Sequence, residues 1–149
     1  MWCFKKRGKQ AIGRSRGGLT TKINTITASD KFAVNFSLSS GSANDSPEGI
    51  KLLNLTQGKG TQIILMDRAY AGKNIREVAV KVGYKPVVPP KKNFKKQWEY
   101  DKELYKKRNA VERFFRRIKR FRRIFKRYDK LDVVYEGFIL FAMVIDSLV

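Results

Sequence analysis

The feature that most constrains the fold is a short, unbroken apolar run from Ile63 to Met66 that ends at Asp67. Four consecutive apolar residues between polar neighbours predict a strand that is buried on both faces. A helix start lies before this run at Pro47, and a helix stop lies after it at Gly83. A buried strand between two helices predicts an α/β fold.

The remaining segments fit the same class. Residues 20–28 are rich in Thr and Ile, and residues 32–38 alternate apolar with polar side chains, which predicts two strands joined by a turn at 29–31. There is no internal repeat. The expected elements are strands at 20–28 and 32–38, a helix from Asp45 or Ser46 to about residue 54, strands at 63–66 and 84–88 around a helix at 73–82, and helices at 101–130 and 133–149.

Length and composition favour one domain. A chain of 149 residues with 42% hydrophobic content can bury one core, and it is too short for two. The first part is rich in Gly, Lys and Arg and shows no periodicity. We therefore expect a single domain over residues 1–149, with a basic arm at 1–19 and the sheet and helices at 20–149.

The net charge of +20 indicates a polyanionic partner. Residues 85–130 hold nineteen basic and five acidic side chains, so most of the excess lies in one stretch. Nucleic acid is the expected partner. No membrane association is expected, because the apolar run Phe138 to Ile145 is too short to span a bilayer and no lipidation signal is present. With no secretory signal and only Cys3, we expect a cytoplasmic location.

Any catalysis by this chain must use carboxylates, because it has no His and one Cys. These counts exclude zinc sites, disulfide frameworks and catalytic triads that contain His. Asp67 is the first candidate, since ligands of open α/β sheets gather at the carboxyl ends of the strands. The alternative is a structural role in which Asp67 caps the turn that follows the strand.

Glu112 is the second candidate because of its place on the expected helix 101–130. A helical projection puts Glu112 in one polar row with Tyr105, Arg108 and Lys119, at the boundary of the buried face. The alternative is simple ion pairing of Glu112 with Arg108 or Arg116. The buried stripe is expected to comprise Leu104, Val111, Phe115, Ile118, Arg122 and Phe125, and the open face to carry Arg113, Arg116, Arg117, Arg120, Arg123 and Arg127.

Metal-dependent chemistry on phosphodiesters needs carboxylates that converge from different elements on Mg²⁺, which prefers oxygen ligands. Asp67 at a strand end and Glu112 on a helix face satisfy this geometric requirement. Tyr105, Arg108 and Lys119 in the same row are then suited to hold phosphate groups beside the metal.

Three segments together resemble a known family. Tyr105, Arg108, Glu112 and Lys119 follow the pattern Tyr, two residues, Arg, three residues, Glu, six residues, Lys. This spacing resembles the signature around the catalytic Glu of DDE-type insertion-sequence transposases. LMDRAY around Asp67 resembles the block of the family's second Asp, and GRSRGGLTTKI and PPKKN resemble its flanking sequence. The resemblance covers residues 5–145.

The resemblance implies a ribonuclease-H-like mixed sheet with flanking helices. It implies that Asp67 is the second and Glu112 the third of three acids that bind two divalent ions, Mg²⁺ or Mn²⁺, for strand cleavage and strand transfer. Tyr105, Arg108 and Lys119 are implied to orient DNA phosphates, and we expect Arg116 and Arg123 on the basic face to add DNA contacts.

The chain departs from the family pattern at its start. The family's first Asp lies on a strand upstream of the basic arm, yet residues 1–29 contain no acid. Asp30 and Asp45 lie after the arm and are poor substitutes. We therefore expect a C-terminal portion of a catalytic domain, without its first strand and inactive alone, that needs an upstream transposase segment or a second copy. The alternatives are a non-catalytic nucleic-acid-binding protein and a complete nuclease whose third acid lies elsewhere in the chain.

Overall fold

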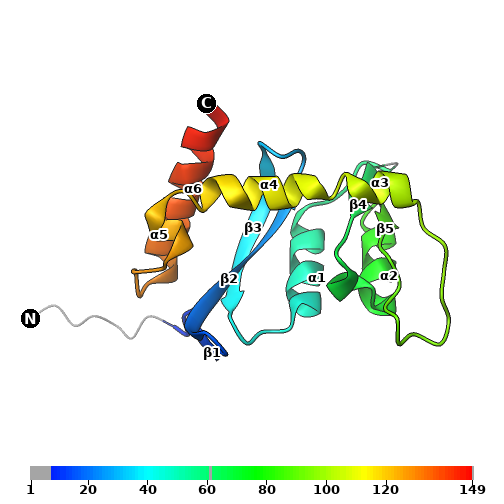
Figure 1. Cartoon of the computed structure of the whole chain (residues 1–149), viewed down its shortest axis with the longest axis horizontal. Helices are drawn as coiled ribbons and strands as arrows, with labels where there is room; N and C mark the ends of the chain where they lie inside the picture. The colour runs from blue at the N-terminus through cyan, green and yellow to red at the C-terminus, as the bar shows by residue number, and fades with distance from the viewer. Residues whose placement is uncertain (1–7, 61, 149) are drawn as a thin grey trace, which may run out of the picture.

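The computed structural model describes residues 8–60 and 62–148 and has the expected mixed α/β architecture (Figure 1). The elements are β1 (Gly13–Ser15), β2 (Gly18–Thr27), β3 (Ala33–Ser40), α1 (Asp45–Leu55), β4 (Gln62–Leu65), the 3₁₀ turn η1 (Arg68–Tyr70), α2 (Lys73–Lys81), β5 (Tyr84–Val87), α3 (Lys102–Lys106), α4 (Asn109–Ile118), α5 (Arg122–Phe125) and α6 (Asp132–Leu148).

The first sheet has three antiparallel strands in the order β1-β2-β3. The predicted hairpin of β2 and β3 is confirmed, with Ile23 opposite Leu38 in the register. The prediction of an arm over 1–19 is wrong for residues 13–19, because β1 folds back on β2 through a turn at Gly18, whose φ is +99°. Glycine adopts this conformation without steric cost. Residues 1–7 of the expected arm lie outside the described residues.

The second sheet has two parallel strands, β4 and β5, joined by α2. Gly83 ends α2 with a φ of +90°, as its position after the helical pattern predicted. A Cβ at Gly83 would lie 2.7 Å from the carbonyl oxygen of Gly58, so the close approach of these two loops also requires glycine. Helix α1 is present as predicted, but its cap is Asn44 and not Asp45 or Ser46. The Asn44 side chain accepts a hydrogen bond from the Ser46 amide at 3.2 Å.

Within the described residues the two sheets are not joined into the single mixed sheet that we expected. Residues Thr21–Thr27 of β2 pair only with β3, and β4 pairs only with β5. Each sheet therefore has an edge without a strand partner in the part of the chain described. The prediction that β4 is buried on both faces is wrong for the same reason: the side chain of Ile63 is 47% exposed.

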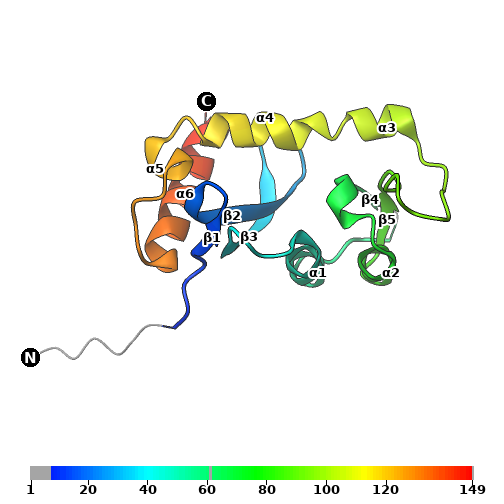
Figure 2. The same cartoon turned by 60° about the horizontal axis from the view of Figure 1, so that its bottom comes forward.

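The expected single helix over 101–130 is divided into α3, α4 and α5. Helices α3 and α4 lie nearly in line, joined by a tight turn in which the amides of Lys107 and Arg108 bond to carbonyls three residues earlier (Figure 2). After α4, Phe121 adopts an extended conformation (φ −73°, ψ 112°) and the chain reverses into α5. This reversal buries Ile124 against α6, so tertiary packing overrides the helical periodicity.

The largest core cluster joins α4, α5 and α6 to one face of the β2–β3 hairpin. Phe114 and Ile118 are fully buried there, while Phe125 is 75% exposed. The predicted stripe was therefore wrong at Arg122 and Phe125, because both lie beyond the break at Phe121 and are exposed, and it omitted Phe114 of α4. Two smaller clusters lie between α1, α2 and the β4–β5 pair, and α1 also packs against β2 and β3.

Helix α6 matches the predicted second apolar helix to within one residue at each end. In the described part of the chain, no helix has the length and apolar character needed to cross a bilayer. Figure 2 shows α3 and α4 lying on one side of the molecule, across from α1 and α2.

Candidate active site

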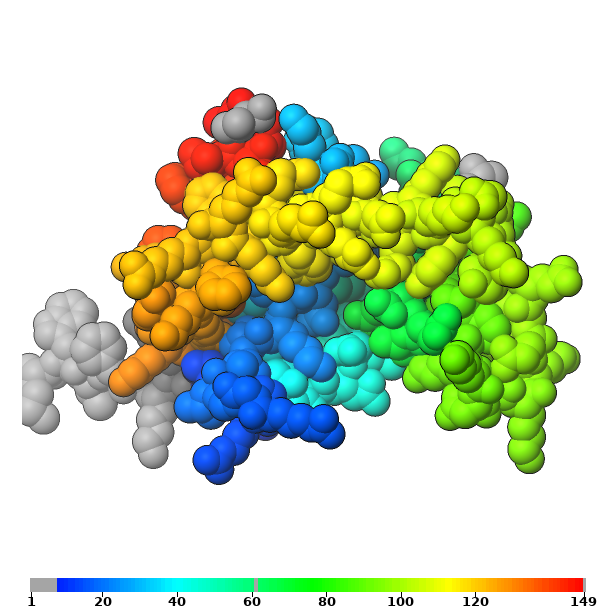
Figure 3. Space-filling model, viewed as in Figure 1, coloured from blue at the N-terminus to red at the C-terminus, as the bar shows by residue number. Residues whose placement is uncertain are grey.

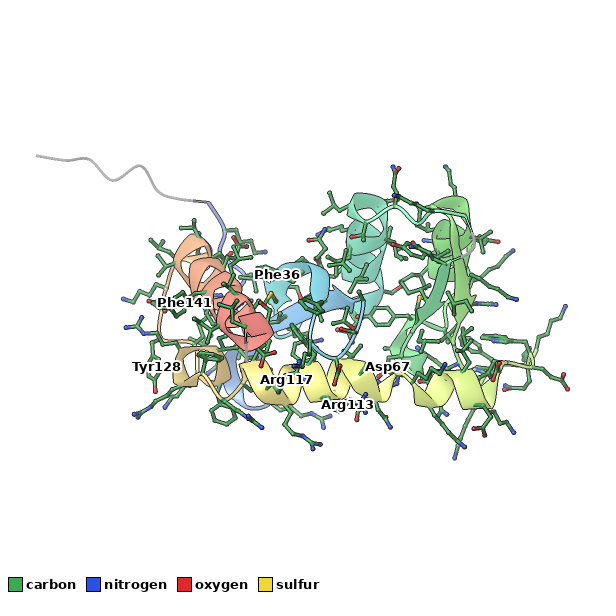
Figure 4. The ribbon with its side chains drawn as sticks, turned by 90° about the horizontal axis from the view of Figure 1, so that it is seen from above. Phe36, Asp67, Arg113, Arg117, Tyr128 and Phe141 are labelled. Atoms are coloured by element: carbon green, nitrogen blue, oxygen red, sulfur yellow. The ribbon has the colours of Figure 1, made fainter. Side chains whose placement is uncertain are left out.

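Asp67 directly follows β4 and caps the turn η1. Its Oδ1 accepts a hydrogen bond from the Ala69 amide at 3.4 Å, so the structural role considered from the sequence is present. The preceding residue, Met66, is buried and fixes the end of the strand. The carboxylate itself is 53% exposed and its Oδ2 is directed toward α4, as Figure 4 shows. Capping therefore uses one oxygen, and the other contacts Arg108.

Glu112 lies in the first turn of α4 and shares a partner with Asp67. The Arg108 guanidinium donates to Glu112 Oε1 at 2.7 Å and to Asp67 Oδ2 at 3.3 Å. Arg108 is 24% exposed, and both carboxylates are 53% exposed. The fold thus brings two acids from separate elements to the two sides of one cation, at a surface that solvent reaches.

Tyr105 belongs to the same cluster. Its ring centroid lies 5.6 Å from the Arg108 Cζ, and the Tyr100 ring packs edge-on against it. Burial raises the pKa of the Tyr105 hydroxyl, the positive charge of Arg108 opposes this shift, and the negative charge of Asp67 adds to it. The hydroxyl therefore keeps its proton at neutral pH and can donate a hydrogen bond.

The other predicted DNA-binding residues lie farther along the chain. Lys119 caps the end of α4 and lies over the Phe115 ring, on the same helical face as Glu112 and about 10 Å away along the axis at 1.5 Å per residue. Arg116 is exposed on α4. Arg123 on α5 is exposed, pairs with Asp129 at 3.3 Å and lies over the Phe138 ring. The structure does not bring these three into the cluster around Arg108.

Two arginines that we placed on the open face are partly buried and held in ion pairs. Arg117 contacts Asp146 of α6 at 2.9 Å and Asp30 of the β2–β3 turn at 3.6 Å. Arg127 contacts Asp132 at 2.7 Å and donates to the Thr21 hydroxyl. The prediction of an open basic face is wrong for these two residues, because the chain reverses after α4 and α6 packs beside it.

Tyr70 was missed by the sequence analysis, although it belongs to the LMDRAY block. The pKa of its hydroxyl is raised to about 12, mainly by burial and further by the negative charges of Asp45 and Asp67. A single sequence gives no signal for this, because the shift depends on packing against α1.

The arrangement of Asp67 and Glu112 fits a divalent cation. Both offer hard oxygen donors, both are half-exposed, and a positive group already lies between them. Within residues 8–60 and 62–148, however, no three acidic or Cys side chains come close enough together to hold a metal ion. Asp30 pairs with Arg113 and Arg117, and Asp45 pairs with Lys22. Neither lies in the cluster around Arg108.

Comparison with known proteins decides the family. Residues 3–102 match a family model described as "Transposase DDE domain", and residues 64–149, which include both Asp67 and Glu112, match a second model with the same description. The chain belongs to the DDE transposase family.

A curated relative from Brucella ovis supports the assignment of this chain to the DDE transposase family. It is named "Putative transposase for insertion sequence element IS6501" and is 28% identical over 126 residues, which cover 83% of this chain and 95% of the relative. No solved structure matches the chain. The predicted resemblance to an insertion-sequence transposase is thereby confirmed. The roles of individual residues stay predictions.

Proposed function

We propose that this DDE transposase chain contributes Asp67 and Glu112 to a metal-dependent site that cleaves and transfers DNA strands. The observation that carries the proposal is the shared contact of both carboxylates with Arg108. Two acids 45 positions apart in the chain have no structural need to flank one partly buried cation, whereas a metal site requires such convergence.

Asp67 and Glu112 would hold divalent ions, Mg²⁺ or Mn²⁺, through their half-exposed oxygens. Such ions, when bound, supply Lewis acidity and activate water at neutral pH. Tyr105 donates its hydroxyl proton in a hydrogen bond to a phosphate oxygen, and Arg108 and Lys119 neutralise the phosphates beside the site. The Tyr105 hydroxyl suits this task because its proton is retained.

The DNA surface extends from this cluster along α4 and α5. Side chains of these helices form one continuous surface across the face seen in Figure 3. Arg116 and Arg123 are exposed on it, and we assign them to phosphate contacts. Counterion release by such contacts makes affinity fall steeply with salt.

The third acid is proposed to come from a further strand. The edge of β4 away from β5 and the edge of β2 away from β3 lack strand partners in the described residues. A strand between them would join the two sheets into one ribonuclease-H-like mixed sheet over a single domain, and it would end beside Asp67. An upstream transposase segment or a second copy would supply it, so the chain alone is expected not to cleave DNA.

The alternative is a non-catalytic nucleic-acid-binding protein. It is favoured by one observation: Arg108 neutralises both acids, as a purely structural ion pair would. Metal dependence separates the two functions. A catalytic site binds divalent ions through Asp67 and Glu112, and a structural ion pair does not.

The test is the midpoint of thermal unfolding with and without Mn²⁺. We expect Mn²⁺ to raise the midpoint of the intact chain, because bound ligands stabilise the native state. The midpoints of Asp67→Asn and Glu112→Gln should not change when Mn²⁺ is added. Glu103→Gln is the matched control, since this exposed acid on α3 lies outside the cluster and pairs with Lys106. If Mn²⁺ raised the midpoints of Asp67→Asn and of the intact chain equally, the assignment of Asp67 to a metal site would be contradicted.

A further inference from the structure

A groove at the edge of the molecule is separate from the cluster around Arg108. Figure 1 shows the segment 88–101 looping out beside α2 and β5, at the end away from α5 and α6. The groove between them has a volume of about 1080 Å³, and its lining includes Lys73, Arg76, Lys81, Phe94, Lys96 and Trp98. This volume slightly exceeds the range of roughly 300–1,000 Å³ for small-ligand sites, so a nucleotide unit fits inside.

Trp98 forms a fixed wall of this groove. Its indole Nε1 donates to the Val88 carbonyl at 3.0 Å, and the Phe94 ring packs against it with centroids 6.0 Å apart. The ring also packs on the buried cluster that includes Met66. Because Met66 directly precedes Asp67, the groove wall and the candidate active site rest on the same strand end.

Arg76 lies flat on this wall. Its Cζ is 3.9 Å from the centroid of the Trp98 ring, a distance typical of a strong cation–π contact. Its buried Nε has no hydrogen-bond partner among the described residues. The nearest acid in sequence, Glu77, pairs instead with Lys73 at 3.7 Å. Because the Nε atom is enclosed by the protein, a ligand reaches Arg76 through the two terminal nitrogens of its guanidinium, which have no hydrogen-bond partner among the described residues.

The chemistry of the groove selects a phosphate group. A guanidinium held flat presents its N–H groups in one plane, which matches the bidentate geometry of a phosphate. The lysines of the groove lie around Arg76, and Glu77 is the one acid that lines it. The exposed side chain of Val80 and the Phe94 ring add apolar surface of the kind that contacts deoxyribose.

We propose that this groove binds the phosphodiester backbone of duplex DNA, with one phosphate on Arg76, as a second contact outside the candidate active site. The inference rests on the proposed function only in requiring that the chain acts on DNA. Trp98 is a positioning residue that holds Arg76. Through Met66, the contact fixes the DNA backbone relative to Asp67.

The experiment is a titration of a labelled 20-base-pair duplex with the full chain, followed by fluorescence anisotropy and by tryptophan emission in a Trp2→Phe background, where Trp98 is the remaining tryptophan. We expect Arg76→Gln to weaken binding about tenfold and to reduce the slope of log affinity against log salt by about one phosphate contact. Duplex binding should change Trp98 emission, and Arg76→Gln should abolish that change. Lys31→Gln, which removes an exposed cation from the β2–β3 turn, should weaken binding less than about twofold.

Two further sets of variants test the role of Arg76. Arg76→Lys retains the charge but not the planar fork, and it should fall between the wild type and Arg76→Gln. If Arg76→Gln fails to fold, Lys95→Gln with Lys96→Gln on the exposed loop replaces it, and a weakening of about fivefold is expected.

The groove assignment is overturned if the wild-type chain binds the duplex without a change in Trp98 emission. It is also overturned if the Arg76 variants bind the duplex as tightly as the wild type. The same emission change with inorganic phosphate alone, at the concentration of duplex phosphate, also overturns it in favour of a simple anion pocket. A wild-type chain that binds no duplex at any salt concentration instead contradicts the proposed function.

Discussion

The two ends of α4 carry the same motif in different surroundings. At the N-terminal end Arg108 joins Asp67 and Glu112, and both carboxylates are 53% exposed. At the C-terminal end Arg117 joins Asp30 and Asp146, and Asp146 is only 12% exposed. Exposed ion pairs contribute little to stability, whereas breaking a buried one is costly. The first cluster is therefore available for exchange with ligands, whereas the second holds the helices together.

The largest expected effect comes from breaking the second cluster. Asp146→Ala leaves Arg117, 20% exposed, with its two contacts to Asp30, the 3.6 Å ion pair and a hydrogen bond to the backbone carbonyl. We expect a loss of about 2 kcal/mol in the free energy of unfolding, below the 3–5 kcal/mol of a fully buried pair because Asp30 remains. Urea denaturation measures it. Asp67→Ala should cost less than about 1 kcal/mol. Equal losses in the free energy of unfolding for the two variants would contradict the difference between the clusters.

The next effect concerns the affinity of the first cluster for cations. Arg108→Met removes the positive charge between Asp67 and Glu112 without shortening the side chain greatly. We expect Mn²⁺ to bind about thirtyfold more tightly, because two unit charges about 4 Å apart in water interact by about 1 kcal/mol and the ion carries two charges. Isothermal titration calorimetry measures the affinity. Arg113→Met, on the same helix but paired with Asp30, is the control, and an effect of the same size there would indicate a general charge effect.

A smaller effect separates the two kinds of arginine on α4. Arg116→Gln should weaken duplex DNA binding about threefold through one lost phosphate contact and leave stability unchanged. Arg117→Gln should reduce stability, because it breaks two ion pairs. Anisotropy and urea denaturation of both variants provide the measurement. A reversal of the two outcomes would contradict the assignment of Arg116 to the DNA surface.

The smallest effect is a pH response beside the first cluster. Tyr70 has a pKa of about 12 in the folded chain and 10 as its ordinary value, so its burial contributes stability that is fully present below pH 10 and is lost as the pH rises to 12. Absorbance at 295 nm follows the titration. Asp67→Asn should lower the Tyr70 pKa only slightly, because burial is the main cause. Tyr70→Phe identifies the contribution of Tyr70 by difference, because the other five tyrosines also absorb when ionised.

Regular elements with strong local patterns could be predicted from the sequence. The alternation at 32–38, the apolar run before Asp67 and Gly83 after α2 each gave the right element. The adjacency of Asp67 and Glu112 also follows from strand-end and helix-face geometry, although their catalytic roles stay predictions. These features depend on neighbours in the sequence or on general rules of α/β folds.

Features that depend on tertiary packing could not be predicted. No Pro or Gly lies within residues 101–130 to signal the breaks at Lys107 and Phe121. The break at Phe121 allows Ile124 to pack against α6. Arg117 is indistinguishable in sequence from its exposed neighbours until Asp30 and Asp146 are placed beside it. The stacking of Arg76 on Trp98 likewise joins elements 22 residues apart.

The single guanidinium shared by Asp67 and Glu112 makes the two acids a thermodynamic unit. A DNA phosphate that accepts hydrogen bonds from Arg108 competes with both carboxylates at once, and a cation that binds the carboxylates releases Arg108. By reciprocity, DNA must then raise the affinity for the cation by the same factor as the cation raises the affinity for DNA. If the proposed function holds, positive cooperativity between nucleic acid and metal follows from one side chain at the start of α4.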